Sequence, residues 1–211
     1  MARYKQTVVL EEAYVAISNA LHRPDLQTPL SRYGYDQTRL QEGLAQYTTV
    51  KQLTQQREQA TQTARETATL YQQSKEQLIE LFQMHRELAR IAYRREAQYT
   101  DHLGLTGPRA SSITDLLAQA ETFYAQVPVA LMERYRVPRK ELNEVAKLVT
   151  KVRDLQAMQR HTQGQVQSLT QTRLQALKRL QTWMRRFMTV AKVALEEQPQ
   201  QLEALNQTVA S

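Results

Sequence analysis

The stretch Arg173–Ala194, RLQALKRLQTWMRRFMTVAKVA, decides the fold that this sequence predicts. Its apolar residues return every three or four positions, and it contains no acidic residue, glycine or proline. This is the spacing of the a and d positions of a heptad, which face a partner helix in a coiled coil. The same frame runs back to Val152 without a slip, with Trp183 and Phe187 among its inward positions. The pattern predicts one long helix of about 60 residues.

A second copy of this pattern begins 102 residues earlier, with a and d positions from Val50 to Ala92. No gap is needed to align the two copies over about 70 residues, a periodicity that indicates a repeat. The sequence therefore predicts a tandem duplication with a first repeat at 1–103, a linker at 104–110 and a second repeat at 111–211. Identical pairs include Leu40 with Leu142, Val50 with Val152, Leu78 with Leu180, Ala89 with Ala191 and Leu103 with Leu205.

Each predicted repeat has the same order of segments. A short amphipathic helix (8–21 or 113–124) leads into a proline-bearing connection (22–32 or 126–135), and a long helix follows. Asp36 and Pro138 mark the expected starts of the long helices. The expected ends are Asp101–Gly104 and Pro199. We therefore predict an all-α protein in which the two long helices pack antiparallel as an elongated, coiled-coil-like bundle, with the short helices docked where the apolar stripe is widest.

One alternative to continuous long helices is a pair of hairpins that turn near Gln55–Thr63 and Ala157–Gln165. Apolar content thins out there, but neither segment contains proline. Gly164 has Gln62 as its counterpart, which argues against a turn that requires positive φ. Continuous helices are the favoured interpretation.

Composition narrows the class of protein. The 211 residues include 29 glutamines, only 5 glycines and 6 prolines, and no cysteine, which argues against β-sandwiches, barrels and disulfide scaffolds. The absence of cysteine also excludes thiol catalysis and Cys-ligated metals. Neither a signal peptide nor an apolar run long enough for a transmembrane helix is expected, so the chain is expected to be soluble and cytoplasmic.

Several segments resemble a group of uncharacterised bacterial two-repeat all-helical proteins. The closing phrase WMRRF at Trp183–Phe187, followed by AKVALEEQPQQLEAL at Ala191–Leu205, is similar to that group's final signature. The segments His85–Ala92, Gly104–Gly107 and Phe123–Tyr124 resemble its first repeat and linker. The resemblance spans most of the chain and implies a duplicated helical fold. It implies no activity, because none is established for the group.

The sequence offers no catalytic, cofactor or metal site. The four histidines, His22, His85, His102 and His161, are isolated, and no pair has the spacing that places two metal ligands on one helix face. No phosphate-binding glycine loop or nucleophile elbow is present. We expect no enzymatic activity.

Six residues on or beside the apolar stripe are expected to be structural. His85 is a predicted core imidazole with one nitrogen hydrogen-bonded, since its counterpart is Phe187. Trp183, Phe187 and Met184 are expected to form core and not a partner hot spot. Arg57 and Arg173, at a or d positions, are expected to set the register of the helices.

A basic stripe is the most distinctive surface feature. Between Leu155 and Leu195 there are seven Lys or Arg residues and no Asp or Glu. Two outward heptad positions carry the candidate partner-binding stripe, Lys178, Arg179, Arg185, Arg186 and Lys192. A candidate acidic counter-stripe, Glu66, Glu80 and Glu87, occupies one outward position of the first repeat.

The sequence leaves three functions open, two of which depend on these charges. A structural or assembly protein whose copies associate through the two stripes, as a homo-oligomer or a filament, is the favoured one. A nucleic-acid or anionic-surface binder that uses the basic stripe is the alternative. A carrier of an apolar ligand is the third, and it requires a cavity near Trp183.

Overall fold

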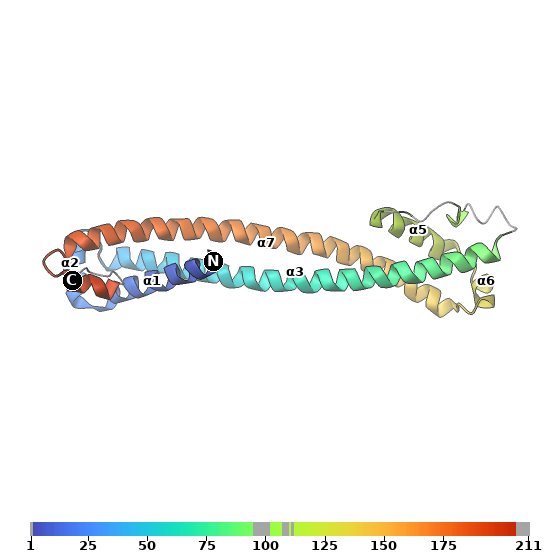
Figure 1. Cartoon of the computed structure of the whole chain (residues 1–211), viewed down its shortest axis with the longest axis horizontal. Coiled ribbons are helices and arrows are strands. Elements are labelled where there is room, and N and C mark those ends of the chain that lie inside the picture. The colour runs from blue at the N-terminus through green and yellow to red at the C-terminus, as the bar shows by residue number, and fades with distance from the viewer. Residues whose placement is uncertain (1, 95–101, 107–109, 111, 206–211) are drawn as a thin grey trace. The chain divides into compact units, whose positions relative to one another are not determined.

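The part of the chain that the computed structural model describes, residues 2–94, 102–106, 110 and 112–205, contains helices and no strand, which confirms the all-α prediction. Side chains are described from Val8 onward. In chain order the elements are α1 (Ala2–His22), α2 (Pro24–Arg32), α3 (Gln37–Ala92), α5 (Ile113–Gln126), α6 (Val129–Arg134), α7 (Arg139–Ala194) and the 3-10 helix η1 (Pro199–Leu205) (Figure 1).

The two long helices confirm the predicted duplication. Helices α3 and α7 each contain 56 residues, and both their starts and their ends lie 102 positions apart. Neither helix is interrupted, so the hairpin alternative is wrong. Every predicted a and d position from Val50 to Ala92 and from Val152 to Ala194 is buried or half-buried. The heptad frame therefore describes the inward faces of both helices.

The turn before each long helix has the same geometry in both repeats. After α2, Gly34 has φ +80°, and the backbone N–H groups of Gly34 and Tyr35 donate to the carbonyls of Ser31 and Leu30. After α6, Arg136 has φ 63° and the same two hydrogen bonds form. This is a Schellman motif, which closes a helix through a residue in the left-handed conformation. Asp36 then caps α3, because its carboxylate accepts from the Arg39 N–H at 2.8 Å.

Two compact units organise the chain. Unit 1 consists of Met1–Gln59 and Val166–Ser211, and unit 2 of Ala60–Gln165. Each unit combines two short helices, the first part of one long helix and the last part of the other. This division differs from the predicted repeats 1–103 and 111–211. The reason is that the long helices run antiparallel, so the start of one packs on the end of the other.

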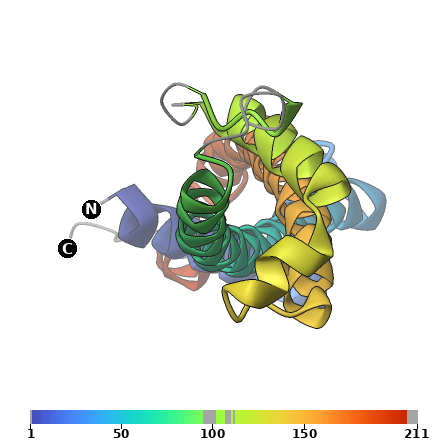
Figure 2. The same ribbon diagram turned by 90° about the vertical axis from the view of Figure 1, so that its right-hand side faces the viewer.

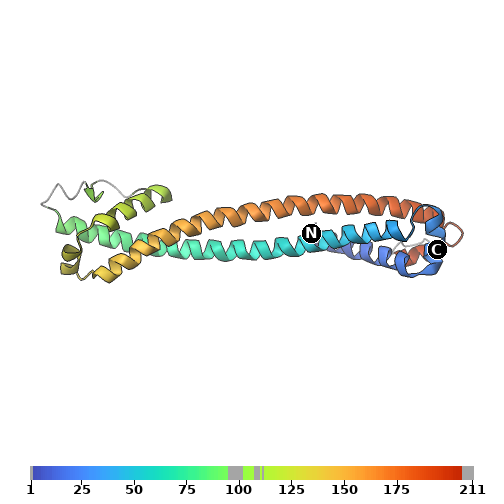
Figure 3. The same ribbon diagram turned by 180° about the vertical axis from the view of Figure 1, so that it is seen from behind.

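Unit 1 shows the antiparallel pairing directly. Gly43 of α3 lies against Trp183 of α7, while Arg57, further along α3, donates from Nε to Thr170 Oγ1 at 3.0 Å. Helix α1 covers this pair, and Ala13, Ile17 and Ala20 are fully buried in the same core (Figure 3). Arg57 thus donates from α3 to a hydroxyl of α7, and its expected role in setting the register stays a prediction.

Unit 2 has an equivalent core. Leu78 and Phe82 of α3 pack with Leu142 and Val149 of α7. Helices α5 and α6 lie beside these segments (Figure 2), and Phe123 of α5 packs edge-on against Phe82 at 5.7 Å between ring centroids. The short helices therefore dock on the apolar-rich parts of the long ones, as predicted.

Both predicted connections and both predicted ends of the long helices are wrong. The connections at 22–32 and 126–135 are largely helical, because a proline such as Pro24 is compatible with the first turn of a helix. Pro138 lies directly before α7, as Asp36 lies directly before α3, so both mark the starts of the long helices as predicted, although Pro138 is not in the first turn. The long helices end at Ala92 and Ala194, before the predicted ends at Asp101–Gly104 and Pro199.

The early helix ends have a physical reason. In unit 2 the Arg86 and Arg90 guanidiniums donate to the carbonyls of Gly104 and Leu105, at 3.1 and 2.8 Å. In unit 1 Asn19 donates from Nδ2 to the Ala204 carbonyl at 2.7 Å. Both contacts require the chain to turn back, which buries apolar side chains after each helix. Residues 107–109 of the predicted linker 104–110, and Asp101, lie outside the described residues.

Candidate functional site

The most polar buried cluster lies in unit 2 around His85, which is fully buried. Its Nδ1 lies 3.0 Å from Tyr124 Oη of α5, and its Nε2 lies 3.0 Å from Glu141 Oε1 of α7. A carboxylate only accepts, so Nε2–H donates to Glu141 and the Tyr124 hydroxyl donates to Nδ1 in the neutral imidazole. The expectation of a buried structural histidine is confirmed, but both nitrogens are paired and not one.

The chemistry of this cluster favours a structural role. The order Tyr124, His85, Glu141 is that of an activated hydroxyl, an imidazole base and an orienting carboxylate. Burial, and secondarily the nearby Glu141 charge, raise the pKa of Tyr124 well above its ordinary value. The phenol therefore holds its proton and is a poor nucleophile, since both causes oppose the phenolate.

The remaining histidines lie apart from this cluster. His22, His102 and His161 are exposed, and His22 bonds the Ser18 carbonyl at 2.8 Å through Nδ1. Within the described residues, no three His, Asp or Glu side chains are close enough together to hold a metal ion.

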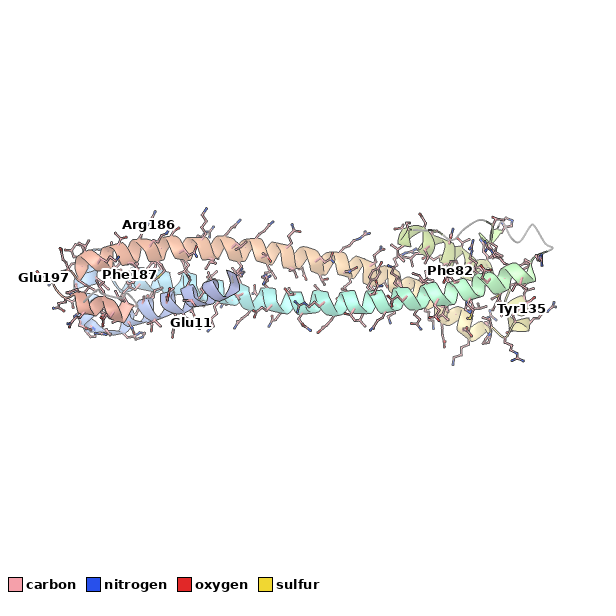
Figure 4. All side chains as sticks on the ribbon, in the orientation of Figure 1. Glu11, Phe82, Tyr135, Arg186, Phe187 and Glu197 are labelled. Atoms are coloured by element: carbon pink, nitrogen blue, oxygen red, sulfur yellow. The ribbon has the colours of Figure 1, made fainter. Side chains whose placement is uncertain are left out.

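Unit 1 carries an aromatic cluster at the position equivalent to the His85 cluster. Trp183 stacks on Phe187 at 5.3 Å between centroids, and Tyr35 contacts both rings at 5.7 and 5.2 Å. Trp183 is 7% exposed and Phe187 0%, so they are core residues as predicted. Phe187 points into the bundle while the neighbouring Arg186 points away from it (Figure 4).

Gly43 makes this aromatic cluster possible. A Cβ at Gly43 would lie 2.4 to 2.7 Å from three atoms of the Trp183 ring, closer than real atoms approach. The six-membered part of the indole therefore occupies the space that a side chain at position 43 would need. Our reading of the sequence missed Gly43. The signal was the small residue at a heptad position where the other repeat has Val145.

The basic stripe is divided between two grooves of unit 1. Arg185 and Lys192 line a groove between α1 and α7, which we call the methionine groove. Lys178, Arg179 and Arg186 line a groove between α3 and α7, which we call the cationic groove. A protein that follows a nucleic-acid backbone needs one continuous row of cations, so this division argues against that alternative.

The methionine groove has an apolar floor and a charged rim. Its volume is about 660 Å³. Arg185 and Lys192 stand on the rim with Glu12 of α1, and Met184 and Met188 are half-buried. Methionine side chains adapt readily to an incoming apolar surface. The residues that form the floor are Val9, Ala13, Met184, Met188 and Leu205.

The cationic groove, of about 560 Å³, runs beside Trp183. Arg39 of α3 joins the three cations of α7 there. A cavity near Trp183 is what an apolar-ligand carrier requires, but this one is rimmed by charge and not by apolar side chains.

The acidic counter-stripe lies on the unit 2 part of α3, and Glu66, Glu80 and Glu87 are all exposed. Each is followed four residues later by an exposed apolar side chain, which lies on the same helix face. These are Leu70, Met84 and Ile91, at 50%, 44% and 61% exposure. The heptad positions predicted the three acids but not the apolar residues beside them. We call the six residues together the acidic-apolar stripe.

Comparison with known proteins adds no assignment. No family model matches this chain, and neither a curated protein nor a solved structure is similar to it. The resemblance to two-repeat bacterial proteins therefore stays a prediction. No helix in the described part of the chain combines the length and apolar character needed to cross a bilayer.

Proposed function

We propose that this protein is a non-enzymatic structural protein whose copies associate head to tail. The acidic-apolar stripe of unit 2 in one copy docks in the methionine groove of unit 1 in the next. One observation carries the proposal: the exposed stripe and the groove match in both polarity and charge.

The apolar match involves side chains of the stripe and of the groove that are exposed to water in a single copy. Met84 and Ile91 project from α3 with about half of each side chain exposed. The groove offers Met184 and Met188 as a deformable floor. Burial of apolar surface supplies the affinity of such a contact, at roughly 25 cal/mol per Å² before the cost of association.

The charge match sets the register of the contact. Glu80 and Glu87 are seven residues apart, and so are Arg185 and Lys192. Because the spacing is the same, the two glutamates can face the two cations whether the helices that carry them run parallel or antiparallel. Opposite charges at the rim of an interface steer association and set its register.

The two surfaces are different, which determines the kind of assembly. A contact between unlike patches is heterologous, so a pair of bound copies still has one free groove at one end and one free stripe at the other. Such a contact produces a ring where the rotation closes and a filament where it does not.

Two blocked variants test the proposal. Arg185→Glu with Lys192→Glu blocks the groove, and Glu80→Lys with Glu87→Lys blocks the stripe. Each variant alone is expected to stay monomeric in analytical ultracentrifugation, while the unmodified chain forms larger species as its concentration rises. A mixture of the two is expected to form larger species again, because the intact stripe of one variant meets the intact groove of the other and the two reversed rows of charge are also complementary.

Lys140→Glu with Lys147→Glu is the matched control. These lysines are exposed, seven residues apart and outside both surfaces, and the change in net charge equals that of the groove variant. Assembly is expected to be unchanged. A mixture that remains monomeric, or a control that dissociates as fully as the groove variant, would disprove the head-to-tail contact.

A further inference from the structure

The cationic groove has an unbalanced charge. Arg39, Lys178, Arg179 and Arg186 line it, and Glu42 is its one carboxylate among the described residues. Glu42 approaches Arg39 at 3.7 Å, with both side chains about half exposed, so that contact is weak. Three positive charges remain in excess. All four cations have exposed side chains and are free to turn toward a ligand.

Two buried polar atoms beside these cations have no hydrogen-bond partner among the described residues. They are Nε1 of Trp183, whose side chain is more than nine-tenths buried, and Oε1 of Gln46. Both residues line the cationic groove. A buried donor without an acceptor is unfavourable, so an acceptor that enters the groove and reaches the Trp183 N–H recovers free energy.

The cations form a short cluster. On α7 they lie between Lys178 and Arg186, which is roughly 12 Å of helix at 1.5 Å per residue. The flanking segments 174–177 and 187–190 contain no charged residue. Two neighbouring cations of α7, Arg185 and Lys192, line the methionine groove instead. A cluster of this length suits a compact ligand and not an extended polyanion.

We propose that the cationic groove binds a small anion with at least two linked phosphate groups, such as inorganic pyrophosphate or the diphosphate of a nucleotide. Guanidiniums bind phosphate through two parallel N–H donors, and three of the four cations are arginines. The Trp183 N–H donates to a further phosphate oxygen. This inference goes beyond head-to-tail association and does not rest on it.

Unit 2 provides an internal comparison for this site. Its residues at the same repeat positions reverse or remove each charge, so this site occurs once in the duplicated fold. Glu141 stands for Arg39, Glu76 for Lys178, Gln77 for Arg179, Met84 for Arg186 and Leu81 for Trp183.

The test uses the full chain and inorganic pyrophosphate. Trp183 is the only tryptophan, so its fluorescence reports on this groove alone, and calorimetry measures the dissociation constant independently. Saturable 1:1 binding that weakens as salt is added is expected. Arg186→Gln is expected to raise the dissociation constant at least tenfold. Arg185→Gln, the same charge loss one residue away on the other groove, is expected to change it less than twofold.

Two further measurements ask whether the phosphate belongs to a nucleotide and whether the indole of Trp183 contributes to binding. If ADP and pyrophosphate bind with equal dissociation constants, the groove recognises the linked phosphates alone. If ADP binds more tightly than pyrophosphate, the groove also recognises the nucleoside. Trp183→Phe, checked for folding by circular dichroism, is expected to weaken binding severalfold in calorimetry. The proposal is overturned by no saturable binding of pyrophosphate at millimolar concentration, by equal effects of the two arginine variants, or by binding of duplex DNA without binding of pyrophosphate.

Discussion

Unit 1 and unit 2 build the same part of the duplicated fold from different chemistry. At one repeat position unit 1 has Phe187, which stacks on Trp183, and unit 2 has His85, which bonds Tyr124 and Glu141. Both versions leave the residue fully buried. The comparison teaches that the helix pair accepts either an aromatic stack or a polar chain, provided that the buried polar atoms of the chain are paired.

A second difference concerns size. Unit 1 pairs Gly43 with Trp183, and unit 2 has Val145 and Leu81 at the equivalent positions. A large residue on one helix is thus balanced by a small one on the other. Because interiors are close-packed, such an exchange keeps the distance between helices nearly constant.

The largest expected effect comes from removing that balance in unit 1. Gly43→Val places a branched side chain in the space of the indole ring, and we expect it to lower the free energy of unfolding by about 3 kcal/mol. Adding Trp183→Leu recreates the pair of unit 2 and is expected to recover more than half of the loss. Urea unfolding followed by far-UV circular dichroism measures both.

Gly164→Ala is the control for the glycine change itself. Gly164 is also inside a long helix, but a Cβ there meets nothing within 4 Å. Alanine is therefore expected to stabilise the protein by about 0.5 to 1 kcal/mol. If Gly43→Ala stabilised to the same extent, the close approach of Trp183 would not restrict position 43.

An intermediate effect is expected from the polar chain of unit 2. Glu141→Leu leaves the buried Nε2–H of His85 without an acceptor, and we expect a loss of about 2 kcal/mol. Glu141→Gln keeps a carbonyl acceptor at that place and is expected to cost less than about 1 kcal/mol. Urea unfolding combined with hydrogen exchange of the unit 2 amides gives both values and their location. If the two variants lost the same free energy of unfolding, this hydrogen bond would not be the cause of the loss.

The smallest effect concerns the turn that the units share. Gly34 and Arg136 occupy the same left-handed position, which suits glycine and strains other residues. Arg136→Gly is expected to stabilise the chain by about 1 kcal/mol, and Gly34→Ala to destabilise it by a similar amount. Thermal unfolding of the pair of variants checks this, and a decrease in stability for Arg136→Gly would contradict it.

Much of the fold could be predicted because it depends on periodicity alone. The heptads place Val50, Leu78, Val152 and Leu180 inward whatever the partner is, and the 102-residue offset aligns both long helices. The basic stripe was also visible, since it needs only a helical period and a count of charges.

The helix ends and the site residues could not be predicted because their causes are far apart in the sequence. Helix α3 ends where Arg86 and Arg90 bond the returning chain at Gly104 and Leu105. The second partner of His85 comes from α5, 39 residues away. The division of the stripe between two grooves depends on which neighbour, α1 or α3, flanks each side of α7.

The contiguous make-up of unit 2 has a consequence for biosynthesis. All of its core residues lie within Ala60–Gln165, whereas unit 1 joins Met1–Gln59 to the last residues of the chain. During N-to-C synthesis, all residues of the unit 2 core have been made before the last part of α7. That part of α7 is the segment on which α1 and the start of α3 pack. We therefore expect unit 2 to fold on the ribosome before unit 1 is complete.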